Sequence, residues 1–247
     1  MTATRVAGID CGTNSIRLLV ADVEDGRLVD LDRRMEVVRL GQGVDRTGRL
    51  APEALARTLD AARRYAAICA DLGAERIRFV ATSATRDAEN RAEFVEGVRE
   101  ALGVTPEVVD GAEEAALSFR GATSVLAGRH PGPFLVVDIG GGSTEVVLGA
   151  SDVEAAWSMD VGCVRLTERH LHGDPPSDAE VAAATADVGR LLDDAARRVP
   201  FGRTATLVGL AGSVTTVTAH ALGLPRYDPA AIDGAVLEVD RALASCA

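Results

Sequence analysis

Two short loops of this sequence carry polar side chains and glycines at the same spacing. Asp10-x-Gly12-x-x-Ser15 and Asp138-x-Gly140-x-x-Ser143 share the pattern D-x-G-x-x-S, and each lies between two apolar runs that are typical of strands. Glycines let the backbone come close to a bound anion and expose several N–H donors together. The pattern predicts two related hairpins, one opening each half of the chain, whose tips bind an anion such as phosphate.

The first of these loops supplies donors on both its backbone and its side chains. Arg17 lies just beyond it, on the same strand face as Ser15. Taken alone, the loop also fits an ordinary tight hairpin in which Asn14 tolerates a left-handed backbone. Its candidate phosphate-binding residues are Gly12, Thr13, Asn14, Ser15 and Arg17.

The second loop is more specific, because three consecutive glycines separate two buried strands, where glycine is costly unless another group comes close. Asp138 precedes the glycines and Glu145 follows them, and Mg²⁺ prefers carboxylate and phosphate oxygens. The loop therefore predicts a phosphate site with Asp138 and Glu145 as magnesium ligands. A strand follows it, which excludes a Walker or a dinucleotide-binding loop. Its candidate phosphate-binding residues are Gly140, Gly141, Gly142 and Ser143.

Three further segments carry candidate residues that are weaker on their own. Glu114 lies at a predicted helix start, where an ionised carboxylate can accept a proton from water, although acids are common there. Arg86 lies in a loop between a buried strand and a helix, a layout that suits anions or simple capping. Gly212 and Ser213 lie at a strand-to-helix turn that either binds phosphate or is merely tight.

Composition limits the classes of function. The net charge is −11 without a basic run, so a nucleic-acid polymer is not expected as a partner. The N-terminus enters a strand at once and no apolar stretch approaches membrane-spanning length, so we expect neither a signal peptide nor a membrane helix. The spacing of the four cysteines suits reduced thiols in the cytoplasm, and the four histidines match neither a metal pair nor a catalytic triad.

The apolar periodicity predicts an α/β fold with a candidate boundary in the breaker cluster at 128–133. Ser177 and Glu180 have the spacing of a capping box. We expect Asp228-Pro229 to start a last helix that reaches the C-terminus. Helices are predicted at 52–72, 91–102, 113–127 and 177–199, and strands at 76–81, 107–110, 157–168 and 205–211.

Six segments in order resemble the exopolyphosphatase/guanosine pentaphosphate phosphohydrolase family of the sugar kinase–actin–Hsp70 superfamily, from about Ala7 to Tyr227. They are GIDCGTNSIRLLVADV, ATSATRDAEN, GAEEAALSFRG, DIGGGSTEVV, VGCVRLTE and GLAGSVTT. The resemblance implies two actin-like (ribonuclease H-like) lobes, residues 1–127 and 128–247, with the active site in the cleft between them. It also implies Mg²⁺-dependent hydrolysis of the terminal phosphoanhydride of inorganic polyphosphate, and a homodimer.

The resemblance also assigns roles to residues. Glu114 corresponds to the proposed general base, and Asp138 and Glu145 correspond to the carboxylates that position metal and water. Residues matching the family's substrate-binding elements are Asn14, Ser15, Arg17, Arg86, Ser143 and the loop glycines. Short family members continue beyond the helix that follows Tyr227 with another strand and helix, so we expect the second lobe to be incomplete at its C-terminal end. Long members add C-terminal helical domains that help to grip long polymers, and their absence from this sequence, with the negative charge, favours short polyphosphate as substrate.

Three alternatives stay open at this stage. Hydrolysis of the 5′-γ-phosphate of guanosine pentaphosphate (pppGpp) would use the same motifs. An actin-like small-molecule kinase would also use paired hairpins, but Glu114 favours water as the acceptor. A non-catalytic regulator that binds polyphosphate or nucleotide would need the loops without the chemistry.

Overall fold

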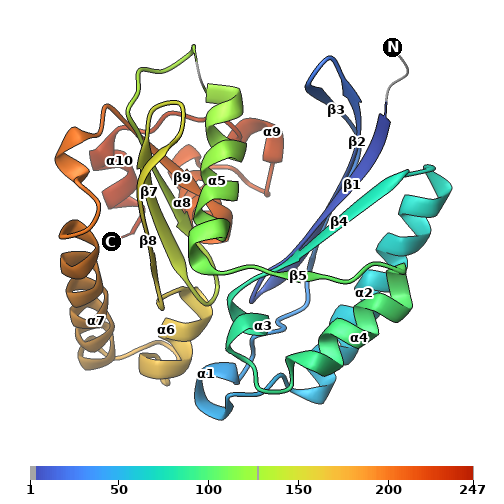
Figure 1. The fold of residues 1–247 in the computed structure, drawn as a ribbon. Helices are drawn as coiled ribbons and strands as arrows, with labels where there is room; N and C mark the ends of the chain where they lie inside the picture. The colour runs from blue at the N-terminus through green and yellow to red at the C-terminus, as the bar shows by residue number, and fades with distance from the viewer. Residues whose placement is uncertain (1–3, 127, 247) are drawn as a thin grey trace.

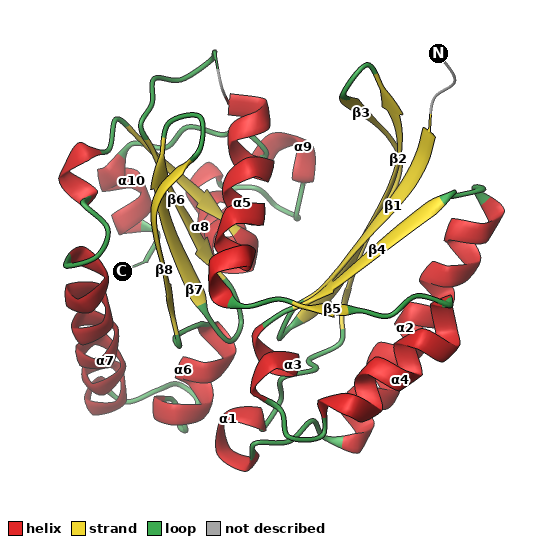
Figure 2. Cartoon of the chain, in the orientation of Figure 1, coloured by secondary structure: helices red, strands yellow, loops and turns green. Residues whose placement is uncertain are grey.

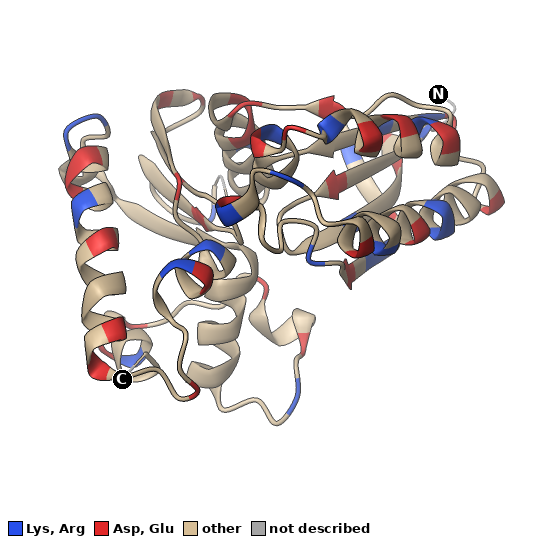
Figure 3. Ribbon diagram, turned by 90° about the horizontal axis from the view of Figure 1, so that it is seen from below, with Lys and Arg blue, Asp and Glu red and all other residues tan. Residues whose placement is uncertain are grey.

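Two β-sheets lie side by side, and they diverge from a shared region of contact near α1, α3 and α6 (Figure 1). The computed structural model describes residues 4–126 and 128–246. No described helix has both the length and the apolar character that a membrane crossing requires. Acidic and basic residues are interspersed along the helices of both halves (Figure 3).

The first sheet has the strand order β3-β2-β1-β4-β5. Strand β2 shows why it forms: Ile16, Leu18 and Val20 alternate with less buried residues and point into the core. Strands β1 and β2 form an antiparallel hairpin, whereas β4 and β5 run parallel to β1. The strands are β1 (Thr4–Cys11), β2 (Ser15–Glu24), β3 (Arg27–Val37), β4 (Arg76–Ala81) and β5 (Glu107–Val108).

Helices α2 and α4 pack together on one side of this sheet (Figure 2). Pro52 occupies the first turn of α2, and Gly103 ends α4 in the left-handed conformation. Their apolar sides enclose Tyr65, Phe79 and Phe94. The helices of this half are α1 (Val44–Thr47), α2 (Pro52–Asp71), α3 (Ser83–Asp87) and α4 (Arg91–Leu102).

The second sheet repeats the first four strands of the first. Its order β8-β7-β6-β9 matches β3-β2-β1-β4, with the same antiparallel hairpin and the same parallel fourth strand. This correspondence confirms the duplicated architecture predicted from the D-x-G-x-x-S repeat. The strands are β6 (Phe134–Ile139), β7 (Thr144–Gly149), β8 (Val153–Met159) and β9 (Thr206–Leu210).

Helices cover both faces of the second sheet. Phe119 of α5 packs on Phe134, Val136 and Val147, whereas α7 packs on the opposite face around Leu135 and Val146. The helices are α5 (Gly111–Leu126), α6 (Cys163–His170), α7 (Asp178–Ala196), α8 (Ala211–Leu222), α9 (Pro229–Ile232) and α10 (Val239–Ala244), with a 3₁₀ turn at Phe201–Arg203.

Helix α5 precedes the boundary expected at 127/128 in chain order, yet it packs on the second sheet. The chain therefore passes at Gly111 from the first sheet to a helix that packs on the second sheet. The division into residues 1–127 and 128–247 stays a prediction, and residue 127 itself lies outside the described residues.

Two expectations about the second half were wrong. The strand predicted at 157–168 is the end of β8 followed by helix α6, which begins at Cys163. The helix expected after Asp228-Pro229 does start there, and Asp228 caps it, but α9 ends at Ile232. Gly234, with a φ of +70°, interrupts the chain before α10.

Candidate active site

The tips of the two hairpins, residues 12–15 (the first tip) and 140–143 (the second tip), lie against each other. A Cβ added to Gly141 would come within 3.1 Å of the Thr13 Cβ and 3.3 Å of the Asn14 backbone nitrogen. One added to Gly142 would lie 2.5 Å from the Thr13 Oγ1 and 2.6 Å from the Ser83 Oγ. Only glycine allows this approach, which explains the consecutive glycines of the second tip.

Hydrogen bonds from neighbouring backbone N–H groups fix the carbonyl groups of the first tip. The Gly12 N–H donates to the Ser15 carbonyl at 3.0 Å and closes the turn. The Thr13 carbonyl accepts from the Gly41 N–H at 2.8 Å, and the Asn14 carbonyl accepts from two N–H groups just after β3. Within residues 4–126 and 128–246, no acceptor pairs with the N–H of Thr13 or Asn14. Two donors therefore stay available to a bound anion.

Helix α6 holds the second tip in the same way. The Gly140 carbonyl accepts from the Cys163 N–H at 3.0 Å, and the Gly141 carbonyl accepts from the Val164 N–H at 3.0 Å. In a trans peptide the C=O and the following N–H point in opposite directions. The N–H groups of residues 141 and 142 therefore point away from α6, and they have no acceptor in the described part of the chain. Successive free N–H groups of this kind form an anion-binding site.

Two acidic side chains lie directly opposite each other beside the second tip. Asp138 of β6 and Glu145 of β7 are register partners, so both point to the sheet face that α5 covers. The Ser118 Oγ donates to Asp138 at 2.7 Å, and the Ser158 Oγ donates to Glu145 at 2.7 Å. The two carboxylates are thus oriented by hydroxyl groups from α5 and β8.

Glu114 reaches the same place from the first turn of α5. It precedes Ser118 by four residues and therefore shares its helix face. Its Oε2 lies 3.2 Å from the Nη1 of Arg86, which also donates to the Val109 carbonyl at 3.0 Å. The neighbouring Glu113 instead contacts Arg78 at 3.1 Å. The structure therefore separates the two adjacent glutamates, and Glu114 is the one beside Asp138.

Burial and mutual repulsion raise the proton affinity of these acids. Burial, followed by the negative charge of Glu114, raises the pKa of Glu145 to about 8, and this residue is 1% exposed. Burial also raises the pKa of Glu114, with Arg86 opposing the shift and the charges of Asp138 and Asp10 adding to it. Desolvation raises the pKa of Asp10, although half of its side chain remains open to water. Carboxylates from both halves therefore share one strongly negative site.

Asp138 and Glu145 fit a cation of the magnesium type. Among residues 4–126 and 128–246, no cluster of three or more His, Cys, Asp or Glu side chains is placed to hold a metal ion. Mg²⁺ commonly takes only one or two carboxylates and completes its shell with water and phosphate oxygens. A register pair of acids beside free N–H donors matches that requirement. A cation would also relieve the repulsion from Glu114, which adds to burial in raising the pKa of Glu145.

The other predicted residues occupy different positions around this site. Ser143 is buried at the second tip, whereas Arg17, the register partner of Asp10, is 47% exposed and has its Nη1 3.9 Å from the Asp10 Oδ2. Gly212 and Ser213 are the second and third residues of α8, which follows Leu210, the register partner of Asp138, so they lie at the same sheet edge. In the described chain, neither of these two residues hydrogen-bonds to a tip.

Ser118, Ser158 and Arg165 were not identified from the sequence. Ser118 lies in GAEEAALSFRG, where the sequence pointed to Glu114 alone, and Ser158 lies in none of the six segments. The packing of α5 and the register of β7 and β8 bring the two serines to the carboxylates. Arg165 lies in VGCVRLTE, a segment with a detectable signal, but reading that segment as a strand hid its contact with the second tip.

Comparison with known proteins places this chain in a family. The model of the Ppx/GppA phosphatase family matches residues 19–225. The chain belongs to the Ppx/GppA phosphatase family. Exopolyphosphatase 2 of Mycobacterium tuberculosis is 54% identical over 241 residues, which cover 94% of this chain and 75% of that protein.

Two further relatives define the range of the Ppx/GppA resemblance. A guanosine-5′-triphosphate,3′-diphosphate pyrophosphatase of Vibrio cholerae is 38% identical over 67% of this chain and 33% of its own length. The crystal structure of an exopolyphosphatase-like protein superposes with a TM-score of 0.96 at 49% identity, covering 99% of this chain and 77% of that one. The two α/β halves expected from the sequence therefore share the fold of this exopolyphosphatase-like protein.

Proposed function

We propose that this protein is an exopolyphosphatase that removes the terminal phosphate of inorganic polyphosphate by hydrolysis. The observation that carries the proposal is the contact between the two tips, which places free N–H donors next to Glu114, Asp138 and Glu145. The relation to Exopolyphosphatase 2 supports polyphosphate as the substrate. The negative net charge favours short chains, because long-range repulsion opposes a longer polyanion.

Cleavage of a phosphoanhydride requires an oriented water, a base and donors around the phosphoryl oxygens. Glu114 suits the base, because burial raises its pKa and Arg86 fixes the orientation of its carboxylate. The N–H groups of Thr13, Asn14 and the second tip bind the terminal phosphate oxygens. The Ser15 and Ser143 hydroxyls, Arg17, Gly12 and the turn at Gly212 and Ser213 complete the proposed binding surface.

Mg²⁺ is the proposed metal, held by Asp138 and Glu145. When bound, it neutralises negative charge on the transferred phosphoryl group. The hydroxyls of Ser118 and Ser158 keep both carboxylates facing the site, as outer partners of metal ligands do.

A second candidate substrate is guanosine pentaphosphate. The relative from Vibrio cholerae favours it, although at lower identity and over less of the chain. Hydrolysis of its 5′-terminal phosphate would use the same N–H donors and the same base. The site residues therefore suit the same reaction on both substrates. Kinetic competition between pppGpp and polyphosphate on one preparation separates the two substrates.

Phosphate release from polyphosphates of defined length, with Mg²⁺ and with EDTA, tests the proposed function. We expect release with Mg²⁺, loss of activity with EDTA, and products shortened by one phosphate at a time. Polyphosphate binding without phosphate release would contradict the enzyme and support a regulator. A strictly sugar-dependent release from ATP would support a kinase.

Two properties of the whole protein are also proposed. We expect a homodimer, on the family resemblance alone, and light scattering of the purified protein measures the mass. We expect a cytoplasmic location without binding to nucleic-acid polymers, in keeping with four free cysteines and the net charge of −11.

A further inference from the structure

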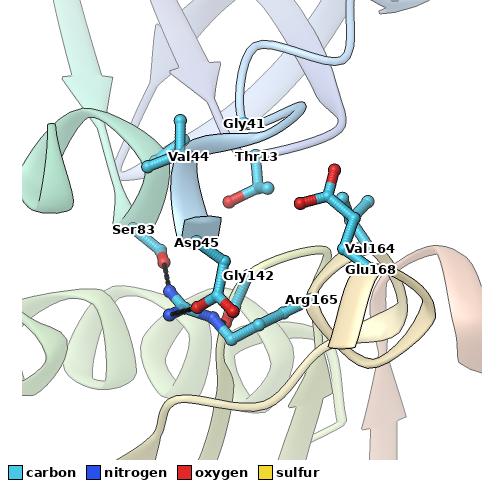
Figure 4. Close-up of a pocket in the computed structure, with 10 residues that line it drawn as sticks. Thr13, Gly41, Val44, Asp45, Ser83, Gly142, Val164, Arg165 and Glu168 are labelled. Atoms are coloured by element: carbon cyan, nitrogen blue, oxygen red, sulfur yellow. Dashed lines mark hydrogen bonds and ion pairs between the residues drawn. The ribbon is translucent and has the colours of Figure 1, made fainter. Parts of the chain in front are cut away.

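The Arg165 side chain lies outside the carboxylate site and joins three segments of the chain (Figure 4). Its Nε donates to the Gly142 carbonyl at 2.7 Å. Its Nη2 donates to the Ser83 Oγ at 3.3 Å and to Asp87 at 2.6 Å, and its Nη1 donates to Asp45 at 2.7 Å. The side chain is only 12% exposed. One guanidinium thus connects the second tip to α3 and α1 of the first half.

The contact with Gly142 determines how the second tip presents a donor. Because the Gly142 carbonyl points at Arg165, the trans peptide directs the Ser143 N–H away from Arg165. No acceptor for this N–H exists in the described residues. Arg165 therefore orients the third free donor of the second tip, next to the two that the α6 backbone orients.

The contacts with α3 connect Arg165 to the base. Ser83 and Asp87 are the first and last residues of α3, so Arg165 holds both ends of this short helix. Arg86 lies between them and pairs with Glu114 at 3.2 Å. A shift of α3 would therefore move the arginine that orients the Glu114 carboxylate.

We propose that Arg165 is a positioning residue, which fixes the Ser143 N–H and the Arg86–Glu114 pair relative to each other across the two halves. This inference rests on the proposed function at the same site. The three guanidinium nitrogens of Arg165 donate hydrogen bonds to three different segments: the second tip, α1 and α3. This arrangement requires the planar, forked geometry of arginine. Lysine would keep the charge between Asp45 and Asp87 but could not reproduce all three directions.

Arg169 offers a matched control on the same helix. It lies one turn after Arg165 and shares the partner Asp45, at 2.7 Å. Its other partners are the Asp160 carbonyl at 3.3 Å and Asp187 at 3.8 Å. Within the described residues, Arg169 thus bridges the two halves without a hydrogen bond to the second tip or to α3, so its loss leaves the contacts of both unchanged.

Steady-state kinetics of phosphate release from tripolyphosphate with Mg²⁺ compares Arg165→Lys, Arg165→Ala and Arg169→Ala with the unchanged enzyme. Misplacement of reacting groups by about 1 Å lowers the reaction rate on the order of 10²-fold. We therefore expect kcat/KM to fall by that factor in Arg165→Ala and by at least about tenfold in Arg165→Lys. In Arg169→Ala we expect kcat/KM to fall by less than about threefold. Added guanidinium ion should restore part of the activity of Arg165→Ala, whereas NaCl at the same concentration should not.

Arg165→Lys tests the positioning role even if Arg165→Ala does not fold, because lysine preserves the positive charge between Asp45 and Asp87. A loss smaller than about tenfold in Arg165→Lys, or an equal loss in Arg169→Ala, would overturn the positioning role. Calorimetric binding of tripolyphosphate, with every variant in the Glu114→Gln background, separates this inference from the proposed function. If the unchanged enzyme releases no phosphate, weaker binding in Arg165→Lys still supports the positioning role, and equal binding overturns it.

Discussion

Asp138 and Glu145 are direct partners across the β6–β7 ladder, at the position that Asp10 and Arg17 occupy across β1 and β2. The duplicated hairpins thus keep one aspartate each but differ in its partner. The two acids of the second hairpin suit the binding of a cation. The arginine beside the aspartate of the first hairpin supplies a positive charge that suits a bound anion. The two halves therefore contribute different chemistry to one site.

Glu114→Gln should lower kcat for phosphate release by about 10²-fold or more, the scale of a lost general base. Glutamine keeps the size of the side chain, so substrate binding should be unchanged. Glu113→Gln is the matched control, because Glu113 is adjacent but pairs with Arg78 instead of facing Asp138. Unchanged turnover in Glu114→Gln, or equal losses in both variants, would remove Glu114 from the mechanism.

Asp138→Asn and Glu145→Gln should each raise the Mg²⁺ concentration needed for half-maximal activity, by about tenfold or more on the scale known for disturbed metal sites. The amides are neutral and bind the cation less strongly. Mg²⁺ titration of phosphate release measures the shift. Asp152→Asn, at an exposed position after β7, serves as control. An unaltered Mg²⁺ requirement in both site variants would place the metal elsewhere.

Glu145→Gln should stabilise the metal-free protein at alkaline pH while it impairs activity. The pKa of Glu145 rises from its ordinary value of 4.5 to about 8 in the folded state, so between these values the unfolded chain loses the proton first. Stability of the unchanged protein therefore falls as the pH rises through this window. Melting temperatures in EDTA should differ most near pH 8, with the variant higher, and converge near pH 5. A lower melting temperature of the variant at pH 8 would contradict the assignment.

Gly142→Ala should separate the two tips, because its Cβ would meet the Thr13 Oγ1 at 2.5 Å and the Ser83 Oγ at 2.6 Å. Overpacking of this kind costs about 1–3 kcal/mol of stability. We expect a matching fall in the free energy of unfolding and a loss of activity. Gly121→Ala in α5 is the control, since open space surrounds that position and alanine favours a helix. Full activity of Gly142→Ala would show that close contact of the tips is not needed.

Local signals predicted much of the fold. The helix at 52–72 has Pro52 in its first turn, and the capping box of Ser177 and Glu180 starts α7 as predicted. The two D-x-G-x-x-S loops became equivalent hairpins because each joins two apolar strands that pair in antiparallel register. Each of these features depends on residues that are close together in the chain.

The errors came where tertiary contacts decide the structure. Helix α6 has only eight residues and none of them is fully buried, so it is too short to show a sustained helical repeat of apolar residues in the sequence. Its contact with the second tip spans more than 20 positions and uses main-chain carbonyls, which leave no mark on residue type. The pairing of Glu114 rather than Glu113 with the site likewise depends on how α5 packs on the second sheet.

A crystal structure of Glu114→Gln with Mg²⁺ and tripolyphosphate tests the central claim most directly. The account predicts the terminal phosphate at the junction where the two tips meet, with its oxygens within hydrogen-bonding distance of the Asn14 and Ser143 N–H groups, and the metal on Asp138 and Glu145. Tripolyphosphate bound away from this junction would contradict it.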